Sequence, residues 1–167
     1  MKKHPILFGF LILLAVVYIF NVFNSSDMPA PSKRPAKITA KQVADMIDDS
    51  CRKIWGSDFY SKLNEDQKTF TVTTWQSSID DALIRRTSEG GDIGAWNDMV
   101  SNMKETANTM QAAFRDCGLD DYTAVLCLAD PVSHSTTYLV IAQGVAGYDV
   151  VNGIDLLNQT EHKLDSL

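Results

Sequence analysis

Histidine is the side chain that most often acts as a general acid or base near neutral pH, so the three histidines are the first candidates for catalysis. Only His134 lies among other reactive groups, in the segment "DPVSHSTT" with Asp130 and Ser133. These residue types could build an acyl-transfer triad, but side chains this close in one loop rarely adopt triad geometry, and the chain has no GxSxG elbow. We therefore expect a solvent-facing loop histidine and predict no catalytic residue. A hydrolase that uses His134 with Asp130 is the least favoured alternative.

Neighbouring carboxylates could bind a cation or assist hydrolysis, and three such pairs occur: Asp48-Asp49, Asp80-Asp81 and Asp120-Asp121. Adjacent residues of a helix point about 100° apart, so neither carboxylate pair on a helix can converge on one ion by itself. The chain also lacks an EF-hand loop, a GxGxxG turn and a Walker loop. The pattern favours solvated helix faces and caps, and it predicts no metal and no cofactor.

The three cysteines, Cys51, Cys117 and Cys127, form no CxxC pair, so their spacing does not indicate a zinc ribbon or a redox motif. Cys51 and Cys117 lie on the apolar stripes of two predicted helices and could meet if these helices pack together. In an oxidising compartment a Cys51–Cys117 disulfide would stabilise the fold by about 4–5 kcal/mol in the chain-entropy model. A Cys117–Cys127 bridge and three free thiols are the alternatives.

Four aromatic side chains are candidates for binding a small ligand: Trp75, Trp96, Tyr138 and Tyr148. Two belong to predicted helices and two to predicted strands, so they could line one pocket between helices and sheet. Ligand pockets are mostly apolar with a few polar groups, which these side chains provide.

Residues 5–23, "PILFGFLILLAVVYIFNVF", are the strongest indication of environment. As a helix they span roughly 28 Å, about the hydrocarbon thickness of a bilayer. The residues that follow offer no good pair of small side chains for signal-peptide cleavage. We therefore expect a retained transmembrane anchor over residues 5–24. A cleaved signal, which would give a secreted or periplasmic protein, is the alternative.

The distribution of charge predicts which side of the membrane the protein occupies. Residues 1–4 form a short basic N-terminus with Lys2 and Lys3, so the positive-inside bias places the N-terminus in the cytoplasm and the C-terminal domain outside it. From Ile38 onward ten Lys and Arg face twenty Asp and Glu, a net of −10. Such an acidic body disfavours nucleic acid, whose binding requires cationic contacts to phosphate. The expected partners are the membrane, through residues 5–23, and an unknown protein.

Helical periodicity appears three times in the expected single globular domain, residues 39–167, which follows a Pro- and Ser-rich linker over residues 25–38. The first helix is predicted from Thr39 to Gly56. The second begins at "NEDQ" (residues 64–67) and continues to residue 86; "TFTVTT" within it is β-prone, but the apolar stripe favours the helix. The third, from the cap Asp92 to Gly118, is the clearest.

After residue 121, "YTAVLCLAD", "TTYLVIAQ" and "YDVVNGI" are β-rich runs with short connections, which predicts antiparallel hairpins. The fold class is therefore α+β: an N-terminal transmembrane helix, then about three helices packed on a small antiparallel sheet of about three strands. Helices followed by a hairpin sheet that ends in "GYDVVNGI" resemble the cone-shaped layout of nuclear-transport-factor-like proteins. This resemblance implies a fold only, with no function and no site residues.

These features together predict a membrane-tethered extracytoplasmic domain with a non-enzymatic role, in protein interaction or envelope assembly. A small-ligand binding module is the alternative.

Overall fold

The computed structural model describes residues 38–75, 87, 89–91 and 93–157. Its elements are α2 (Ala40–Trp55), β1 (Phe59–Asn64), β2 (Thr69–Thr74), α4 (Gly94–Asp116), β3 (Thr123–Ala129), β4 (Thr137–Ala142), β5 (Val145–Asp149) and β6 (Ile154–Asp155). The apolar segment 5–23 and most of the linker lie outside the described residues. In the described part, no helix combines the length and the apolar character needed to cross a membrane.

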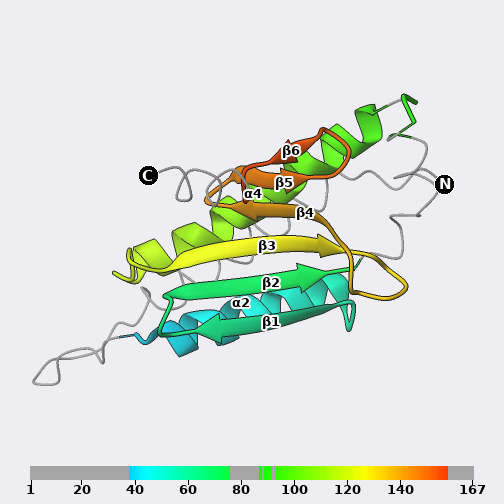
Figure 1. Cartoon of the computed structure of the whole chain (residues 1–167). Helices are drawn as coiled ribbons and strands as arrows, with labels where there is room; N and C mark the ends of the chain where they lie inside the picture. Colours follow the sequence, from blue (N-terminus) through cyan, green and yellow to red (C-terminus); the bar gives the residue numbers. More distant parts are fainter. Residues whose placement is uncertain (1–37, 76–86, 88, 92, 158–167) are drawn as a thin grey trace, which may run out of the picture.

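The two described helices pack on one face of a six-stranded mixed sheet, with α2 behind β1 and β2 and α4 behind the remaining strands (Figure 1). The strands lie in the order β1-β2-β3-β4-β5-β6, and every neighbouring pair except β2–β3 is antiparallel. The predicted α+β class is confirmed. The predicted small antiparallel sheet of about three strands is wrong, because the sheet has six strands and one parallel pair.

The predicted second helix is wrong over residues 64–74, which form the end of β1, a tight turn and β2. Asn64 Oδ1 accepts a hydrogen bond from the backbone N–H of Gln67 at 3.1 Å, the same contact that an N-cap residue makes in a helix. Lys68 then takes a left-handed φ of 52°, which turns the chain back into β2. The residues of this predicted helix from 76 to 86 lie outside the described part.

The parallel pair joins β2 to β3 in the register Thr69↔Thr123 to Thr74↔Leu128. Parallel neighbours need a long crossover, and α4 lies within the connection between them. Because the β1–β2 hairpin stands between the two helices in the chain, the order of elements differs from helices followed by a hairpin sheet, and the nuclear-transport-factor-like layout is not what forms.

The three later β-runs form strands with antiparallel neighbours, as predicted, but their boundaries differ. The tight turn between β4 and β5 is Gln143-Gly144, with φ of 51° and 73°, so both residues have the positive φ of a type I′ hairpin. "YDVVNGI" is not one strand, because a turn after Asp149 divides it into the end of β5 and the start of β6.

The long helix α4 contributes six buried residues to the core, as its period predicts. Its end is the predicted one: Leu119 N–H donates to Phe114 O and Gly118 N–H to Arg115 O, a Schellman motif with Gly118 at φ 71°. Its N-cap is Ile93, without a side-chain cap, where the sequence predicts Asp92, which lies outside the described residues. The buried face of α4 consists of Trp96, Val100, Met103, Ala107, Met110 and Phe114.

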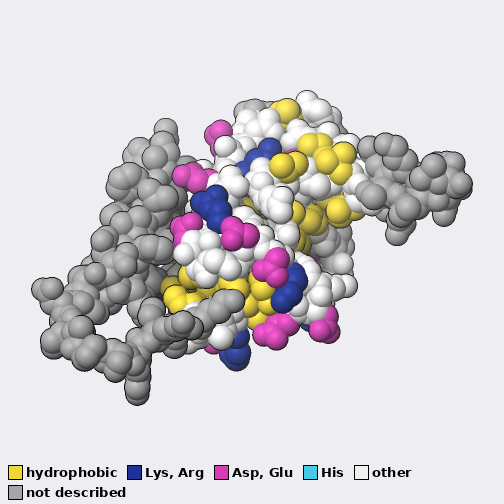
Figure 2. Space-filling view, turned by 90° about the vertical axis from the view of Figure 1, so that its left-hand side faces the viewer, with side chains coloured by type: hydrophobic (Ala, Val, Ile, Leu, Met, Phe, Trp, Pro, Cys, Tyr) yellow, Lys and Arg dark blue, Asp and Glu magenta, His cyan; other side chains and the backbone are white. Residues whose placement is uncertain are grey.

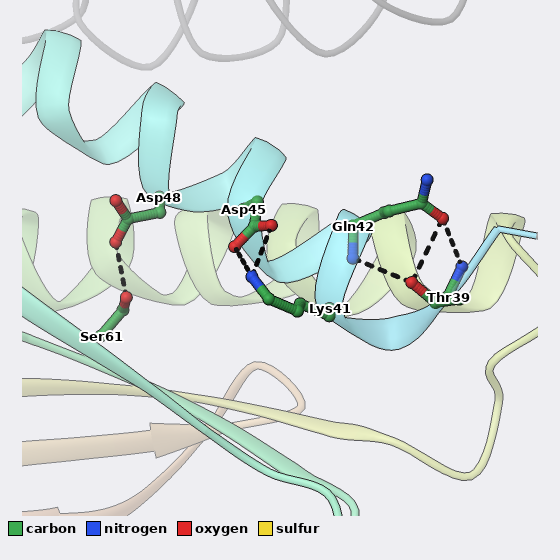
Figure 3. Close-up of polar contacts among 6 residues, drawn as sticks. All are labelled: Thr39, Lys41, Gln42, Asp45, Asp48 and Ser61. Carbon is green, nitrogen blue, oxygen red and sulfur yellow. Dashed lines mark hydrogen bonds and ion pairs between the residues drawn. The ribbon is translucent and has the colours of Figure 1, made fainter.

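The shorter helix α2 begins at a capping box (Figure 3), in which Thr39 Oγ1 accepts from the Gln42 N–H and Gln42 Oε1 accepts from the Thr39 N–H. It ends at Gly56, so the first helix has the predicted bounds. Ser61 of β1 donates its hydroxyl proton to Asp48 of α2, which ties the helix to the edge of the sheet.

Candidate functional site

A groove lined mostly by apolar side chains lies between α2 and α4, and we call it the α2–α4 groove. Its free volume is about 70 Å³, and about 720 Å³ when the gaps between atoms and the open solvent at its mouth are counted. Figure 1 shows that the two helices run in opposite directions, so the last turns of α4 lie beside the first turns of α2. Its lining residues are Val43, Met46, Ile47, Ser50, Cys51, Ile54 and Trp55 of α2 and Thr106, Thr109, Met110, Ala113, Asp116 and Cys117 at α4.

The groove exists because both helices carry a wider apolar stripe than the sheet covers. On α2, Val43, Ile47 and Cys51 are buried, whereas Met46 and Ile54 are only half-buried. On α4, the small side chain of Ala113 is also half-buried. Large side chains on one wall and a small one on the other leave an open space between the helices.

The length of the groove follows from helix geometry. Val43 to Trp55 on α2 and Thr106 to Cys117 on α4 each span about 17–18 Å at 1.5 Å per residue. The groove is therefore as long as about three turns of a helix.

Charged residues stand on both rims. Asp49 and Lys53 on α2 and Glu105 on α4 are exposed and lie next to the lining residues on the solvent side of each helix. Asp116, also exposed, is itself one of the lining residues. Arg115 Nε lies 3.4 Å from Asp116 Oδ1 and offsets that charge in part. The α2 rim is balanced and the α4 rim is acidic.

Apolar side chains also reach the surface at the end of the molecule where α2 begins. Figure 2 views this end and shows a band of apolar side chains in its lower part, at the height at which Figure 1 draws α2. Lys, Arg, Asp and Glu side chains border the band, so apolar and charged surface alternate there.

The three cysteines are free thiols in this structure, and two of them line the groove. Burial, then the nearby Asp48, raises the pKa of Cys51 to about 12, and burial raises the pKa of Cys117. Because the helices are antiparallel, Cys117 lies beside the start of α2, and Cys51 lies about 12 Å further along from Val43. This offset does not favour a direct Cys51–Cys117 bridge, which stays a prediction.

The third thiol, Cys127, lies on the other face of the sheet, since its neighbours Leu126 and Leu128 are buried toward the helices. Burial raises its pKa to about 11, although a hydrogen bond with Thr73 acts in the opposite direction. A Cys117–Cys127 bridge would join opposite sides of the sheet.

None of the four aromatic residues predicted to form a ligand pocket lines the α2–α4 groove. Trp96 is fully buried in the core, and its indole N–H donates to Asp149 at 2.9 Å. Tyr148 precedes Asp149 in β5 and therefore points to the opposite face, while Tyr138 is half-buried against the core. Trp75 follows β2 and is half-buried. The structure does not bring Trp96 together with the other three.

Trp75 instead forms an aromatic cluster with His134, whose ring stacks on it at 4.0 Å between centroids, and with Tyr60 at 6.0 Å. His134 is exposed, as predicted for a loop histidine, and has a left-handed φ of 57°. Its ring therefore lies against the indole face of Trp75, and its charge also acts on the nearby Asp130.

The Asp130 carboxylate organises this loop from within. It accepts hydrogen bonds from the backbone N–H groups of Val132 and Ser133 and from the Ser133 hydroxyl, which in turn lies 2.7 Å from the Ser135 hydroxyl. The Ser133 hydroxyl first, then the two N–H groups, lowers the pKa of Asp130. In a Ser-His-Asp triad the histidine lies between the serine and the aspartate, whereas here Ser133 bonds Asp130 directly. These contacts therefore do not form a triad.

The acidic pairs are spread along the surface in the described part. Asp48 binds Arg52 and Ser61, and Asp121 lies 3.9 Å from Lys68, while the pair at residues 80–81 lies outside the described residues. Among the residues that the structure describes, no group of three or more His, Cys, Asp or Glu side chains could hold a metal ion.

Comparison with known proteins does not assign this chain to a family. The sequence matches no protein-family model, and neither a curated protein nor a solved structure is significantly similar to it. The functional argument therefore rests on the groove, its rims and the sequence.

Proposed function

We propose that the protein is a membrane-tethered, extracytoplasmic domain with a non-enzymatic role, which binds a protein partner in the α2–α4 groove. The observation that carries this proposal is the open apolar groove between two antiparallel helices. A contiguous apolar surface on a folded domain is typical of an interaction site. Residues 5–23 would hold the domain at the membrane, with the N-terminus in the cytoplasm.

The shape of the groove favours a macromolecular partner over a small ligand. Pockets for small molecules enclose most of the ligand surface, whereas this groove is partly open to solvent and extends over about three helical turns. Nine of its thirteen lining residues are apolar, and the polar ones are Ser50, Thr106, Thr109 and Asp116. A long element of another protein would bury the apolar floor and leave these polar groups at a wet rim.

The test uses the full-length chain in native membranes, with a photo-crosslinking amino acid at Met46 in the groove. The matched control carries the same amino acid at Thr71, whose neighbours Phe70 and Val72 face the helices, so that Thr71 lies on the other face of the sheet. We expect a discrete protein adduct from position 46 and none from position 71. Ala113→Phe, which fills the groove with a neutral side chain, should abolish the adduct.

Two results would contradict the proposal. One is an adduct from both positions that Ala113→Phe leaves unchanged, since binding would then not depend on the groove. The other is protection of the C-terminal domain from added protease in sealed right-side-out membrane vesicles, since the domain would then be cytoplasmic. Copurified lipid seen by native mass spectrometry, displaced by Ala113→Phe and without a protein adduct, would favour the small-ligand alternative.

A further inference from the structure

We infer that the groove takes an amphipathic α-helix of about three turns whose flank along α4 is basic, an inference that rests on the proposed function. The first support is length. Both walls extend for about 17–18 Å, which equals the rise of about 12 helical residues.

The second support is the shape of the contact surface. An amphipathic helix presents an apolar stripe at positions i, i+3, i+4 and i+7, and such a stripe fits an open groove without being enclosed. On α2 the half-buried apolar side chains Met46 and Ile54 stand eight residues apart at the groove wall, with Ser50 midway between them. The bound helix would therefore be a third helix in the layer that α2 and α4 already form.

The third support is charge. The α2 rim, with Asp49 and Lys53, is balanced, whereas the α4 rim carries Glu105 and Asp116. The chain from Ile38 onward has a net charge of −10, from ten basic and twenty acidic residues. An acidic body attracts basic partners over distance, and an acidic rim on one side orients them.

The same charges disfavour a second copy of this chain as the occupant. A copy would bring a second α4 rim with the same acidic residues, and like charges placed opposite one another repel. The occupant that we propose is therefore a helix of another protein.

The experiment uses the full chain in nanodiscs of phosphatidylcholine alone, a zwitterionic lipid that does not itself attract basic peptides. Three capped peptides of about 14 residues serve as probes. The first has a leucine stripe with lysines along one flank, the second has glutamates in place of the lysines, and the third has the first composition in scrambled order. Binding is measured by fluorescence anisotropy of the labelled peptide, at low salt and at high salt.

Two native thiols give an independent readout of where the peptide binds. Cys117 lines the groove and Cys127 lies on the opposite face of the sheet, and both are half-buried. A peptide in the groove should slow alkylation of Cys117 by N-ethylmaleimide in proportion to occupancy and leave the rate at Cys127 unchanged. Mass spectrometry of the digested chain separates the two sites.

We expect the lysine peptide to bind about fivefold more tightly than the glutamate peptide at low salt, as two exposed charge pairs allow, and the difference to shrink in high salt. Glu105→Lys leaves one acidic and one basic side chain on the α4 rim and should therefore remove most of the preference; this exposed residue lies outside the packed core, so the fold should persist. Ala113→Phe should remove binding, whereas Thr71→Phe, the same side chain on the other face, should retain it.

Three outcomes would overturn the inference and leave the proposed function standing, provided that the crosslink from position 46 is still formed. These are equal binding of the lysine and glutamate peptides, equal binding of the scrambled peptide, and no binding of any peptide. Loss of the position 46 crosslink as well would overturn both. Slower alkylation of Cys127 with unchanged Cys117 would also overturn the inference, because the peptide would then lie on the sheet face.

Discussion

The buried Asp149 carboxylate offers the sharpest test of how the fold is held together. It is 1% exposed and accepts four hydrogen bonds: from the Trp96 indole N–H at 2.9 Å, from the backbone N–H groups of Val151 at 3.1 Å and Asn152 at 3.0 Å, and from the Asn152 side-chain amide at 2.7 Å. One side chain thus joins the start of α4 to the turn between β5 and β6.

These contacts set the free energy of folding that Asp149→Ala should lose. Asp149→Ala leaves the fully buried Trp96 N–H without an acceptor, which costs about 1–3 kcal/mol. The N–H groups of Val151 and Asn152 belong to a partly exposed turn that water can reach, so they add about 0.5–1 kcal/mol each. The expected loss is about 2–5 kcal/mol, a large share of the roughly 5–15 kcal/mol that holds a domain together.

The assay is equilibrium urea unfolding of the full chain in non-ionic detergent micelles, followed by far-UV circular dichroism. Trp96→Phe removes the same donor while keeping most of the ring, and should cost about 2 kcal/mol. Because Asp149 and Trp96 contact each other, the double variant should show a coupling energy of about 1–2 kcal/mol. A coupling below about 0.5 kcal/mol, or an Asp149→Ala loss under about 1 kcal/mol, would refute this account of the network.

Three further predictions use matched positions. Gly144→Ala and Gly153→Ala, at φ of 73° and 67°, should each destabilise the fold by about 1 kcal/mol in the same urea assay. An added Cβ would meet only the end of the exposed Asn108 side chain at Gly144, which can move away, and open space at Gly153, so a much larger loss at Gly144 alone would contradict this account. Alkylation of the folded chain at pH 8 should be faster at Cys117 than at Cys51, because burial raises the pKa of the Cys51 thiol to about 12. The thiol of the unfolded chain ionises near pH 8.5, so the folded state should lose stability as the pH rises above that value. Equal alkylation rates at the two cysteines would contradict the burial of Cys51. Thr39→Ala should cost about 1 kcal/mol through loss of the capping box, seen as a lower urea midpoint with an unchanged slope, and no change would mean that the cap contributes nothing.

The helices could be predicted where a local signal and a long period agreed. The stripe of α4 repeats over six turns and ends at Gly118, and α2 has the Thr39 cap and the Gly56 stop. Each of these signals acts within a few residues of the chain. The two helices could therefore be predicted without knowing which elements pack against them.

The hairpin of β1 and β2 could not be separated from a helix by such local signals. The Asn64 side chain bonds the Gln67 N–H both in a helix cap and in the observed turn, so the motif is the same. The strand is decided by its partner β3, since Thr69 pairs with Thr123, 54 positions along the chain. β-propensity depends on such neighbours, and a window of residues does not contain them.

The groove was only partly visible in the sequence. The α2 stripe includes both Val43 and Met46, and this spread is wider than one core contact requires. The sequence does not show which part of that stripe the sheet leaves uncovered. The sequence also does not show that Trp96 and Tyr148 lie on different faces of the sheet, because Trp96 bonds Asp149 and alternation along β5 sends Tyr148 and Asp149 to opposite faces.

The single parallel pair has a consequence for how the chain assembles. Hairpins form from nearby residues, so α2 with β1 and β2 makes one local unit and β3 to β6 make another. Among the described residues these two units share one ladder, β2–β3. It closes after the intervening stretch that contains α4 is in place, and closing so long a loop carries an entropic cost. We expect this seam to be the slow step of folding, and until it closes β2 presents an unsatisfied edge to its surroundings.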